Sequence, residues 1–169
     1  SIEHALEQTV ARFGHISALI HTAGIADVFT TLDKETNPFN LARLEKIMAV
    51  NTTGSALVAS LVAAQMAKQK ANNNGDKGVI ILTASIAAFE GQTGQIAYSA
   101  SKGAIVGMTL PLARDLARFS IRVMTIAPGL MDTPMLAGLP EKAYQQLSAL
   151  PLHPKRLGLG REYAMLSQH

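Results

Sequence analysis

The sequence contains no cysteine and no tryptophan, and only 16% of its 169 residues are charged. The absence of cysteine excludes disulfides, cysteine-ligated metal sites and thiol catalysis, and it is typical of proteins from a reducing compartment. The histidines are scattered without the spacing of metal ligands, so we predict no metal site. Apolar residues make up 48% of the chain, so much of its surface must be covered.

Neither sign of charge is in large excess, since the formal net charge is +3. Lys68, Lys70 and Lys77 form one loose basic cluster with no aromatic residue between them. We interpret this cluster as a solvated helix end and loop, and we predict no nucleic-acid binding. The apolar run at 56–64 is shorter than the roughly 20 residues that cross a bilayer, so we predict no membrane segment.

Helix and strand patterns alternate along the chain in a way that is typical of a parallel sheet with covering helices. Ser1 and Gly14 delimit a first amphipathic helix, as its cap and its stop. Short apolar runs predict strands at residues 16–21, 78–84 and 121–127. Longer apolar patterns predict helices at residues 41–68 and 98–118. The sequence therefore predicts an α/β fold.

Three side chains after the second predicted strand form a candidate acid–base site. Ser85 ends this strand, and Tyr98 and Lys102 begin the following helix four residues apart. One helical turn separates Tyr98 from Lys102, so both lie on the same helix face. A nearby ammonium group favours the phenolate and lowers the pKa of a tyrosine from its ordinary value of about 10. With the Ser85 hydroxyl on a substrate oxygen, the three residues can move a proton on and off that oxygen.

The Tyr-x-x-x-Lys spacing alone also fits an ordinary solvated helix face, but longer strings make the pattern specific. These strings are Phe89-Glu90-Gly91-Gln92, Tyr98-Ser99-Ala100-Ser101-Lys102-Gly103 and Ile121-Arg122-Val123-Met124-Thr125-Ile126-Ala127-Pro128-Gly129-Leu130. With them the chain resembles the short-chain dehydrogenase/reductase family. Within that family it is similar to the group of 3-hydroxyacyl-CoA dehydrogenases of type 2, also called 17β-hydroxysteroid dehydrogenases of type 10. The resemblance extends over essentially all 169 residues.

The resemblance implies a Rossmann-like fold, a doubly wound parallel sheet, of which this chain is the C-terminal, catalytic portion. Such a fold holds a dinucleotide on a Gly-rich turn between a first strand and a helix. The only Gly-x-Gly, Gly158-Leu159-Gly160, follows no apolar strand, and we interpret it as a loop before a helix at 162–166. We therefore expect residues 1–169 to form a single partial domain that lacks the N-terminal dinucleotide-binding βαβ unit and the last strand.

The resemblance also implies roles for individual residues. Asn51, Ser85, Tyr98 and Lys102 are the implied catalytic residues, with Asn51 holding a water that connects the lysine to solvent. The implied cofactor-binding residues are Tyr98 and Lys102 together with two loop segments, Ala23, Gly24, Pro128, Gly129, Leu130 and Thr133. The implied substrate-binding residues are Ser85, Gln92, Gln95 and Tyr98.

Two features leave a structural interpretation open. Family members carry Asn directly before the Ala-Gly pair or one residue earlier, where this chain has Thr22 and His21. The strand-bracing hydrogen bonds of that asparagine are therefore in question, and we expect no catalytic role for His21. Asn51 lies in an N-glycosylation sequon, which its apolar helix disfavours. It can also be an amide that bends the helix and is satisfied by backbone groups.

A segment bounded by prolines near the C-terminus also allows two interpretations. Its apolar and aromatic residues are Met135, Leu136, Leu139, Tyr144, Leu147 and Leu150. In the family the corresponding segment is a mobile lid over the substrate, and a Met- and Leu-rich lining adapts to varied shapes. The same residues can equally belong to the hydrophobic core.

The function implied by the resemblance is an NAD(H)-dependent oxidoreductase that interconverts a secondary alcohol and a ketone. The implied substrates are 3-hydroxyacyl-CoA and 3-oxoacyl-CoA, and NADP remains possible in place of NAD. One alternative is a 3-oxoacyl carrier-protein reductase or a hydroxysteroid dehydrogenase. Another is a catalytically silent, truncated chain that acts as a dimerisation module.

We expect the chain to self-associate through its two apolar helices. In relatives the helices that correspond to 41–68 and 98–118 pair with their copies, which implies a homodimer or homotetramer. The alternative is that other parts of the same chain cover these faces. We expect a cytoplasmic location, or the mitochondrial matrix in a eukaryote.

Overall fold

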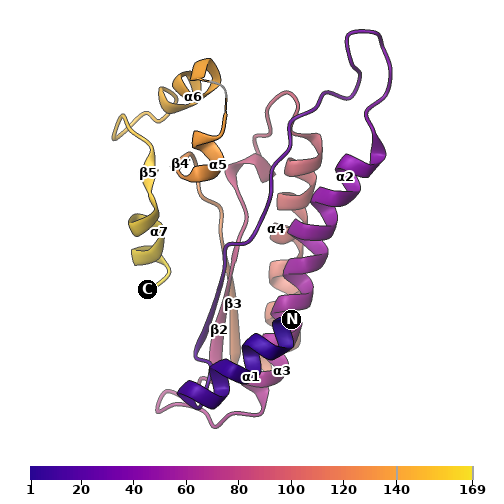
Figure 1. The fold of residues 1–169 in the computed structure, drawn as a ribbon. Helices are drawn as coiled ribbons and strands as arrows, with labels where there is room; N and C mark the ends of the chain where they lie inside the picture. The colour runs from indigo at the N-terminus through magenta and orange to yellow at the C-terminus, as the bar shows by residue number, and fades with distance from the viewer. Residues whose placement is uncertain (140, 169) are drawn as a thin grey trace. The chain divides into compact units, whose positions relative to one another are not determined.

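The computed structural model describes residues 1–139 and 141–168, and the chain divides into two compact units. The first unit is Ser1–Ile126 and the second is Ala127–His169 (Figure 1). The first unit contains a three-stranded sheet and the second a two-stranded one. The predicted acid–base site lies in the first unit.

The sheet of the first unit is parallel, with strand order β1-β2-β3. Its strands are β1 (Ala18–His21), β2 (Gly78–Thr83) and β3 (Ile121–Ile126). Each predicted strand is therefore present, with ends that differ by one or two residues. Because the strands are parallel, their carboxyl ends meet at one edge, which is where ligands bind in open α/β sheets.

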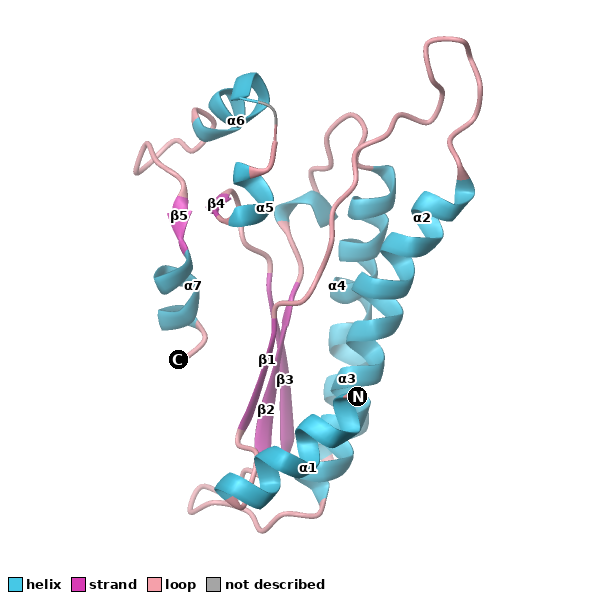
Figure 2. Cartoon of the chain, in the orientation of Figure 1, coloured by secondary structure: helices cyan, strands magenta, loops and turns pink. Residues whose placement is uncertain are grey.

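Helices α3 (Ser55–Ala67) and α4 (Ile96–Ala117) lie on the crossovers between neighbouring strands, on the same side of the sheet (Figure 2). Right-handed crossovers between strands that are added in one direction place both helices on one face. Ile80 and Leu82 of β2 and Val123 of β3 are buried on this face. On the opposite face Ile20 and Met124 are 46% and 47% exposed. Ile81 of the central strand lies between them and is buried, so in the described residues this second face is exposed at the edge strands β1 and β3.

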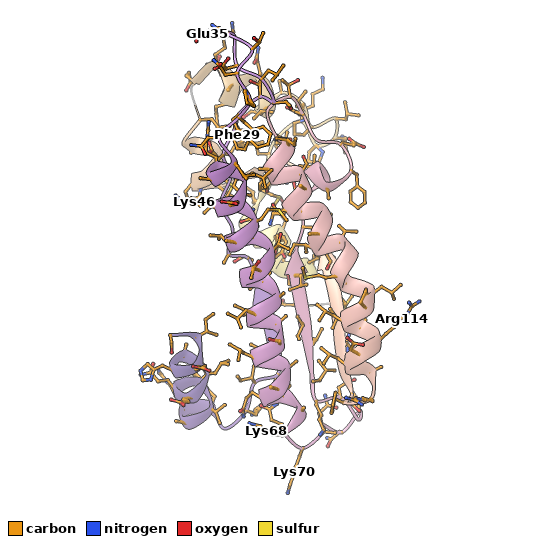
Figure 3. All side chains as sticks on the ribbon, turned by 90° about the vertical axis from the view of Figure 1, so that its right-hand side faces the viewer. Phe29, Glu35, Lys46, Lys68, Lys70 and Arg114 are labelled. Carbon is orange, nitrogen blue, oxygen red and sulfur yellow. The ribbon has the colours of Figure 1, made fainter. Side chains whose placement is uncertain are left out.

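The helical stretch predicted at 41–68 consists of three consecutive segments that form one rod (Figure 3). They are α2 (Leu41–Met48), the π-helical turn η1 (Ala49–Gly54) and α3. By length and composition alone, Leu41–Ala67 is apolar enough to cross a membrane, with a mean hydropathy of 1.6 over a window that is 33% buried. The length argument drawn from residues 56–64 is therefore wrong, although a core helix of a globular protein has the same composition.

Caps explain where the helices of the first unit end. Helix α1 (Ile2–Phe13) begins where Ser1 Oγ accepts a hydrogen bond from His4 N, and it ends at Gly14 with φ of 80°. Lys77 Nζ donates to the carbonyl of Ala67 at 2.7 Å, so this lysine caps the end of α3. Lys68 and Lys70 lie at the same end of the unit (Figure 3).

The second unit is built around the parallel pair β4 (Met131–Asp132) and β5 (Gly158–Leu159). The loop predicted at Gly158-Leu159-Gly160 is therefore wrong. Gly158 N donates to Leu130 O at 3.0 Å, and a Cβ on Gly158 would lie 2.5 Å from Met131 Sδ, so the methionine side chain packs into the space that the glycine leaves. The following helix, α7 (Gly160–Leu166), begins two residues before its predicted start.

The proline-bounded segment that contains Met135 and Leu150 forms two short helices in the second unit, α5 (Pro134–Ala137) and α6 (Glu141–Ser148). Neither helix buries a residue fully, and Met135 and Leu150 are 46% and 51% exposed. The interpretation of these residues as hydrophobic core therefore finds no support within the unit. Pro140 lies outside the described residues.

An ion pair gives the second unit a testable dependence on pH. Arg156 Nη2 lies 2.7 Å from Glu162 Oε1, and Leu159 N donates to Glu162 Oε2 at 2.7 Å. Arg156 and this N–H lower the pKa of Glu162 from 4.5 to about 2. Because the folded-state pKa is depressed, the stabilisation is complete above the unfolded value and is lost as pH falls from 4.5 to about 2.

We expect Glu162→Gln to remove this acid dependence from the second unit, because the amide cannot titrate or form the ion pair. The measurement is an NMR titration of the Glu162 carboxyl carbon together with the amide signals of α7. A carboxyl midpoint at the ordinary value of a glutamate, or α7 signals that move identically in the variant, contradicts the prediction.

Candidate active site

Ser85 and Tyr98 meet at the carboxyl edge of the first sheet. Ser85 follows β2 and caps the short helix η2 (Ile86–Ala88), its Oγ accepting from Ala87 N at 3.1 Å. Tyr98 lies in the first turn of α4, which begins two residues before the predicted start. A hydrogen bond joins the side chains of Ser85 and Tyr98. This hydrogen bond lowers the Tyr98 pKa, and the Ser85 hydroxyl can supply its proton while its oxygen accepts at the helix cap.

Lys102 lies one turn further along α4 and is 5% exposed. Its Nζ donates to Thr83 O at 2.7 Å and lies 5.7 Å from the centroid of the Tyr98 ring. Burial lowers the pKa of Lys102. The structure therefore brings Ser85, Tyr98 and Lys102 together, as the spacing in the sequence predicted.

The electrostatics of Tyr98 differ from the expectation drawn from the sequence. Burial raises the pKa of Tyr98 above 10.0, and only the hydrogen bond from Ser85 opposes this rise. Lys102 contributes no lowering, although its ammonium group lies 5.7 Å from the centroid of the Tyr98 ring while it donates to the Thr83 carbonyl. Tyr98 is therefore held in its protonated form at neutral pH.

Asn51 lies in the π-helical turn η1, is 1% exposed and has a fully occupied amide. Its Oδ1 accepts from Ile25 N at 2.8 Å, and its Nδ2 donates to Ile25 O at 2.9 Å and to Ser101 Oγ at 3.0 Å. The interpretation of Asn51 as an amide satisfied by backbone groups is thus supported, and the implied water relay stays a prediction. A single π-turn inside a long helix often marks a functional site.

Sequence reasoning missed Ser101, which lies on α4 and receives a hydrogen bond from Asn51. Ser101 is 0% exposed, and its Oγ donates to Tyr98 O at 2.7 Å while it accepts from Asn51. Ser101 lies inside the string Tyr98–Gly103, on which the resemblance to the family rests. Its position three residues after Tyr98 on a buried helix could have indicated it from the sequence. Ser101 therefore links Asn51 to the backbone of Tyr98.

The loop after β1 lacks the family's asparagine, since this chain has His21 and Thr22 there. Asn51 of η1 instead forms two hydrogen bonds with the backbone of Ile25, and these bonds brace the end of the strand. A Cβ added to Gly24 would lie 3.3 Å from Asn51 Oδ1 and 3.6 Å from Lys102 Nζ. Gly24 of the predicted cofactor segment Ala23-Gly24 is thus next to Lys102.

The predicted substrate residues Gln92 and Gln95 lie close to each other but not at the catalytic hydroxyls. Gln95 Oε1 accepts from Gln92 N at 2.9 Å, so this side chain closes the loop before α4. Both residues line a cavity of about 370 Å³ together with Thr30, Thr31, Gly91, Thr93, Gly94, Ile96 and Ser99. Ser85 and Tyr98 are not among its lining residues, so a substrate role for the two glutamines stays a prediction.

The remaining predicted cofactor residues belong to the second unit. Pro128, Gly129 and Leu130 follow β3, and Thr133 caps α5 by accepting from Leu136 N at 3.4 Å. A Cβ on Gly129 would meet no atom within 4 Å, so nothing within the described structure demands glycine there. The role of this segment stays a prediction.

A further cavity lies away from Tyr98, and the described residues contain no candidate metal site. A larger cavity, of about 450 Å³, lies around Gly14, His15 and Lys77 at the amino-terminal edge of the sheet, away from Tyr98. In residues 1–139 and 141–168, no group of three or more histidine, aspartate or glutamate side chains is arranged to hold a metal ion.

We expect Asn51→Ala to destabilise the protein by about 1 to 3 kcal/mol, because the Ile25 backbone and Ser101 lose their partner. Urea unfolding measures the difference, with the exposed Asn74→Ala as a control that changes stability by less than about 0.5 kcal/mol. Equal stability of the Asn51 variant and the unaltered protein contradicts the bracing role.

Three comparisons place the chain among known proteins. The sequence profile described as short chain dehydrogenase matches residues 1–143. The human 3-hydroxyacyl-CoA dehydrogenase type-2 is 48% identical over 168 residues, which cover 99% of this chain and 64% of that protein. The 3-oxoacyl-(acyl-carrier-protein) reductase FabG of Thermotoga maritima is 35% identical over 167 residues, which cover 98% of this chain and 62% of that protein.

A solved structure agrees with these relatives. The crystal structure of 3-hydroxyacyl-CoA dehydrogenase type-2 from Mycobacterium avium matches with a TM-score of 0.87 at 32% sequence identity, over 99% of this chain and 67% of that one. The chain thus spans about two thirds of the length of its relatives, 64% in the human protein. With the profile match over most of its length, this chain belongs to the short-chain dehydrogenase family.

Proposed function

We propose that this chain is the catalytic portion of an oxidoreductase that interconverts a secondary alcohol and a ketone with NAD(H). The observation that carries the proposal is the cluster of the half-buried Ser85 and Tyr98 with the buried Lys102 at the carboxyl edge of a parallel sheet. Membership of the short-chain dehydrogenase family supports it.

In this proposal Tyr98 moves the proton on the reacting oxygen. Its raised pKa keeps the phenol protonated at neutral pH, so Tyr98 can donate to the oxygen of a ketone that is being reduced. In the opposite direction the phenolate takes the proton from the alcohol. Ser85 orients the same oxygen and stabilises the phenolate by its hydrogen bond to Tyr98.

The residues around Gly24 fit the ribose of a nicotinamide cofactor. A Cβ at position 24 would fill the space beside Asn51 Oδ1 and Lys102 Nζ, so glycine keeps this space open. In the described residues no carboxylate forms an ion pair with Lys102, whose ammonium can therefore donate to a hydroxyl there. The bound cofactor supplies or takes up the hydride at the reacting carbon. NAD is the proposed form, with NADP as the alternative.

The proposed substrates are 3-hydroxyacyl-CoA and 3-oxoacyl-CoA thioesters. The 48% identity to the human 3-hydroxyacyl-CoA dehydrogenase type-2 supports this choice over the 35% identity to a reductase of acyl-carrier-protein thioesters. A carrier-protein thioester or a hydroxysteroid is the alternative substrate. Side-by-side assays of the three substrate classes distinguish these assignments.

We also propose that the chain assembles as a homodimer or homotetramer through α2–α3 and α4, in the cytoplasm or the mitochondrial matrix. Apolar side chains on these helices support the assembly, since Val50, Leu57 and Leu110 are 39%, 50% and 55% exposed. The same surface is what favours the alternative function, a catalytically silent dimerisation module.

Tyr98→Phe tests the proposed function directly. We expect kcat for 3-oxoacyl-CoA reduction to fall by at least about a hundredfold, because the variant lacks the acid that protonates the oxygen. Tyr163→Phe, on α7 of the second unit and outside the segment interpreted as a lid, is the matched control and is expected to retain activity. Activity of Tyr98→Phe within about tenfold of the parent removes Tyr98 from the mechanism. A parent that turns over no substrate favours the dimerisation module.

The pH dependence follows from the Tyr98 pKa. We expect kcat/KM for reduction to be constant at neutral pH and to fall as pH rises past the Tyr98 pKa, while kcat/KM for oxidation rises with pH. Ser85→Ala removes the hydrogen bond that lowers this pKa, so both profiles are expected to move to higher pH. Profiles of Ser85→Ala that move to lower pH, or stay in place, show that another group titrates.

A further inference from the structure

His21, the last residue of β1, lies against the helix layer and has no role in the mechanism above. It is on the sheet face that α3 and α4 cover, since it is the register partner of Leu82, and it is 9% exposed. Its Nδ1 lies 3.5 Å from Ser55 Oγ at the start of α3. A buried imidazole in this position needs partners for its polar atoms.

The hydrogen bonds of Ser55 determine which ring nitrogen carries the proton. Ser55 Oγ donates its only proton to Asn51 O at 2.6 Å, so it can take part in the contact with His21 only as an acceptor. The contact with Ser55 therefore requires a proton on Nδ1, which leaves the lone pair on Nε2 in a neutral ring.

The ring is connected to the catalytic helix through buried polar groups. Ser55 binds the carbonyl of Asn51, and the Asn51 side chain binds both Ile25 and Ser101. Ser101 in turn donates to the carbonyl of Tyr98 at 2.7 Å. The ring at the end of β1 is thus the first member of a chain of contacts that ends at the backbone of the proposed acid.

We propose that His21 is a positioning residue that, as the neutral Nδ1–H tautomer, donates to Ser55 and thereby holds η1 and α4 in register with the end of β1. The kinetic part of this inference rests on the proposed function, whereas the tautomer can be measured without any activity. The ring acts through Ser55, Asn51 and Ser101, and it touches no reacting atom.

The charge near the ring favours its neutral form. Lys102 of α4 is the charged group that acts on His21, while its hydrogen-bonding neighbours Ser55 and Asn51 on the adjoining helix carry no charge. Burial and, to a smaller extent, the Lys102 charge lower the pKa of His21, and the hydrogen bond to its own carbonyl opposes them. A second cation beside a buried lysine is unfavourable, so the ring acts as a neutral donor.

The first test is nitrogen NMR of the imidazole rings in the unaltered protein. Long-range ¹H–¹⁵N spectra identify the nitrogen that carries the proton, and a pH series follows the titration of each histidine. We expect His21 to carry its proton on Nδ1 at neutral pH and to titrate below the ordinary value of 6.5. A proton on Nε2, or titration at or above 6.5, overturns the proposal whatever the activity of the protein.

The second test compares two amides that imitate different ring nitrogens. The amide nitrogen of His21→Asn takes the place of Nδ1 and keeps the donor to Ser55, whereas the amide of His21→Gln takes the place of Nε2. We expect kcat of the Asn variant within about threefold of the parent, and kcat of the Gln variant to fall by about tenfold to a hundredfold as α4 shifts. Ser55→Ala is expected to match His21→Gln.

The exposed His15 supplies the control pair, since His15→Asn and His15→Gln are expected to leave kcat unchanged. A merely space-filling role for His21 predicts similar losses in both amide variants, so equal kcat values for His21→Asn and His21→Gln overturn the proposal. A parent without turnover contradicts the proposed function instead, and the tautomer measurement then decides the structural claim alone.

Discussion

The contact on which the rest of the first unit depends is the pair of hydrogen bonds between the Asn51 side chain and the backbone of Ile25. An amide in the interior of an apolar helix is costly unless all of its hydrogen-bonding groups are satisfied. Here the π-helical turn directs the amide to the exit of β1, and its remaining N–H reaches Ser101 on α4. One side chain therefore fixes the loop at Gly24 and the helix that carries Tyr98 relative to each other.

Burial sets the electrostatics of the site that this contact holds. Removal from water disfavours charge, so it raises the pKa of Tyr98 and lowers the pKa of Lys102. Burial alone thus favours a neutral phenol and a neutral amine over a phenolate–ammonium pair. The hydrogen bond from Ser85 favours the phenolate, and the carbonyl of Thr83 favours the ammonium. Burial and hydrogen bonding therefore act in opposite directions on both groups, and the proposed proton transfer at Tyr98 depends on their balance.

The sequence predicted the parallel sheet, the long helices and the cluster of Ser85, Tyr98 and Lys102, because periodicity and helical spacing are local properties. It did not predict the π-helical turn or the hydrogen bonds of Asn51 to Ile25 and Ser101, since these bonds join groups 26 and 50 residues apart. The direction of the Tyr98 pKa was wrong for the same reason. Spacing places Lys102 on the correct helix face, but only the fold shows that its ammonium points to the Thr83 carbonyl.

The buried polar groups favour the enzyme over the dimerisation module. A module that only pairs apolar helices is served best by an apolar interior, because buried polar groups at most break even with apolar packing. This interior instead holds Asn51, Ser101 and Lys102, all 5% exposed or less. The ammonium of Lys102 is the most costly of these groups, and its carbonyl partner does not neutralise its charge. In the proposed function this lysine binds a hydroxyl of the cofactor beside Gly24, and helix pairing offers no comparable reason for its position.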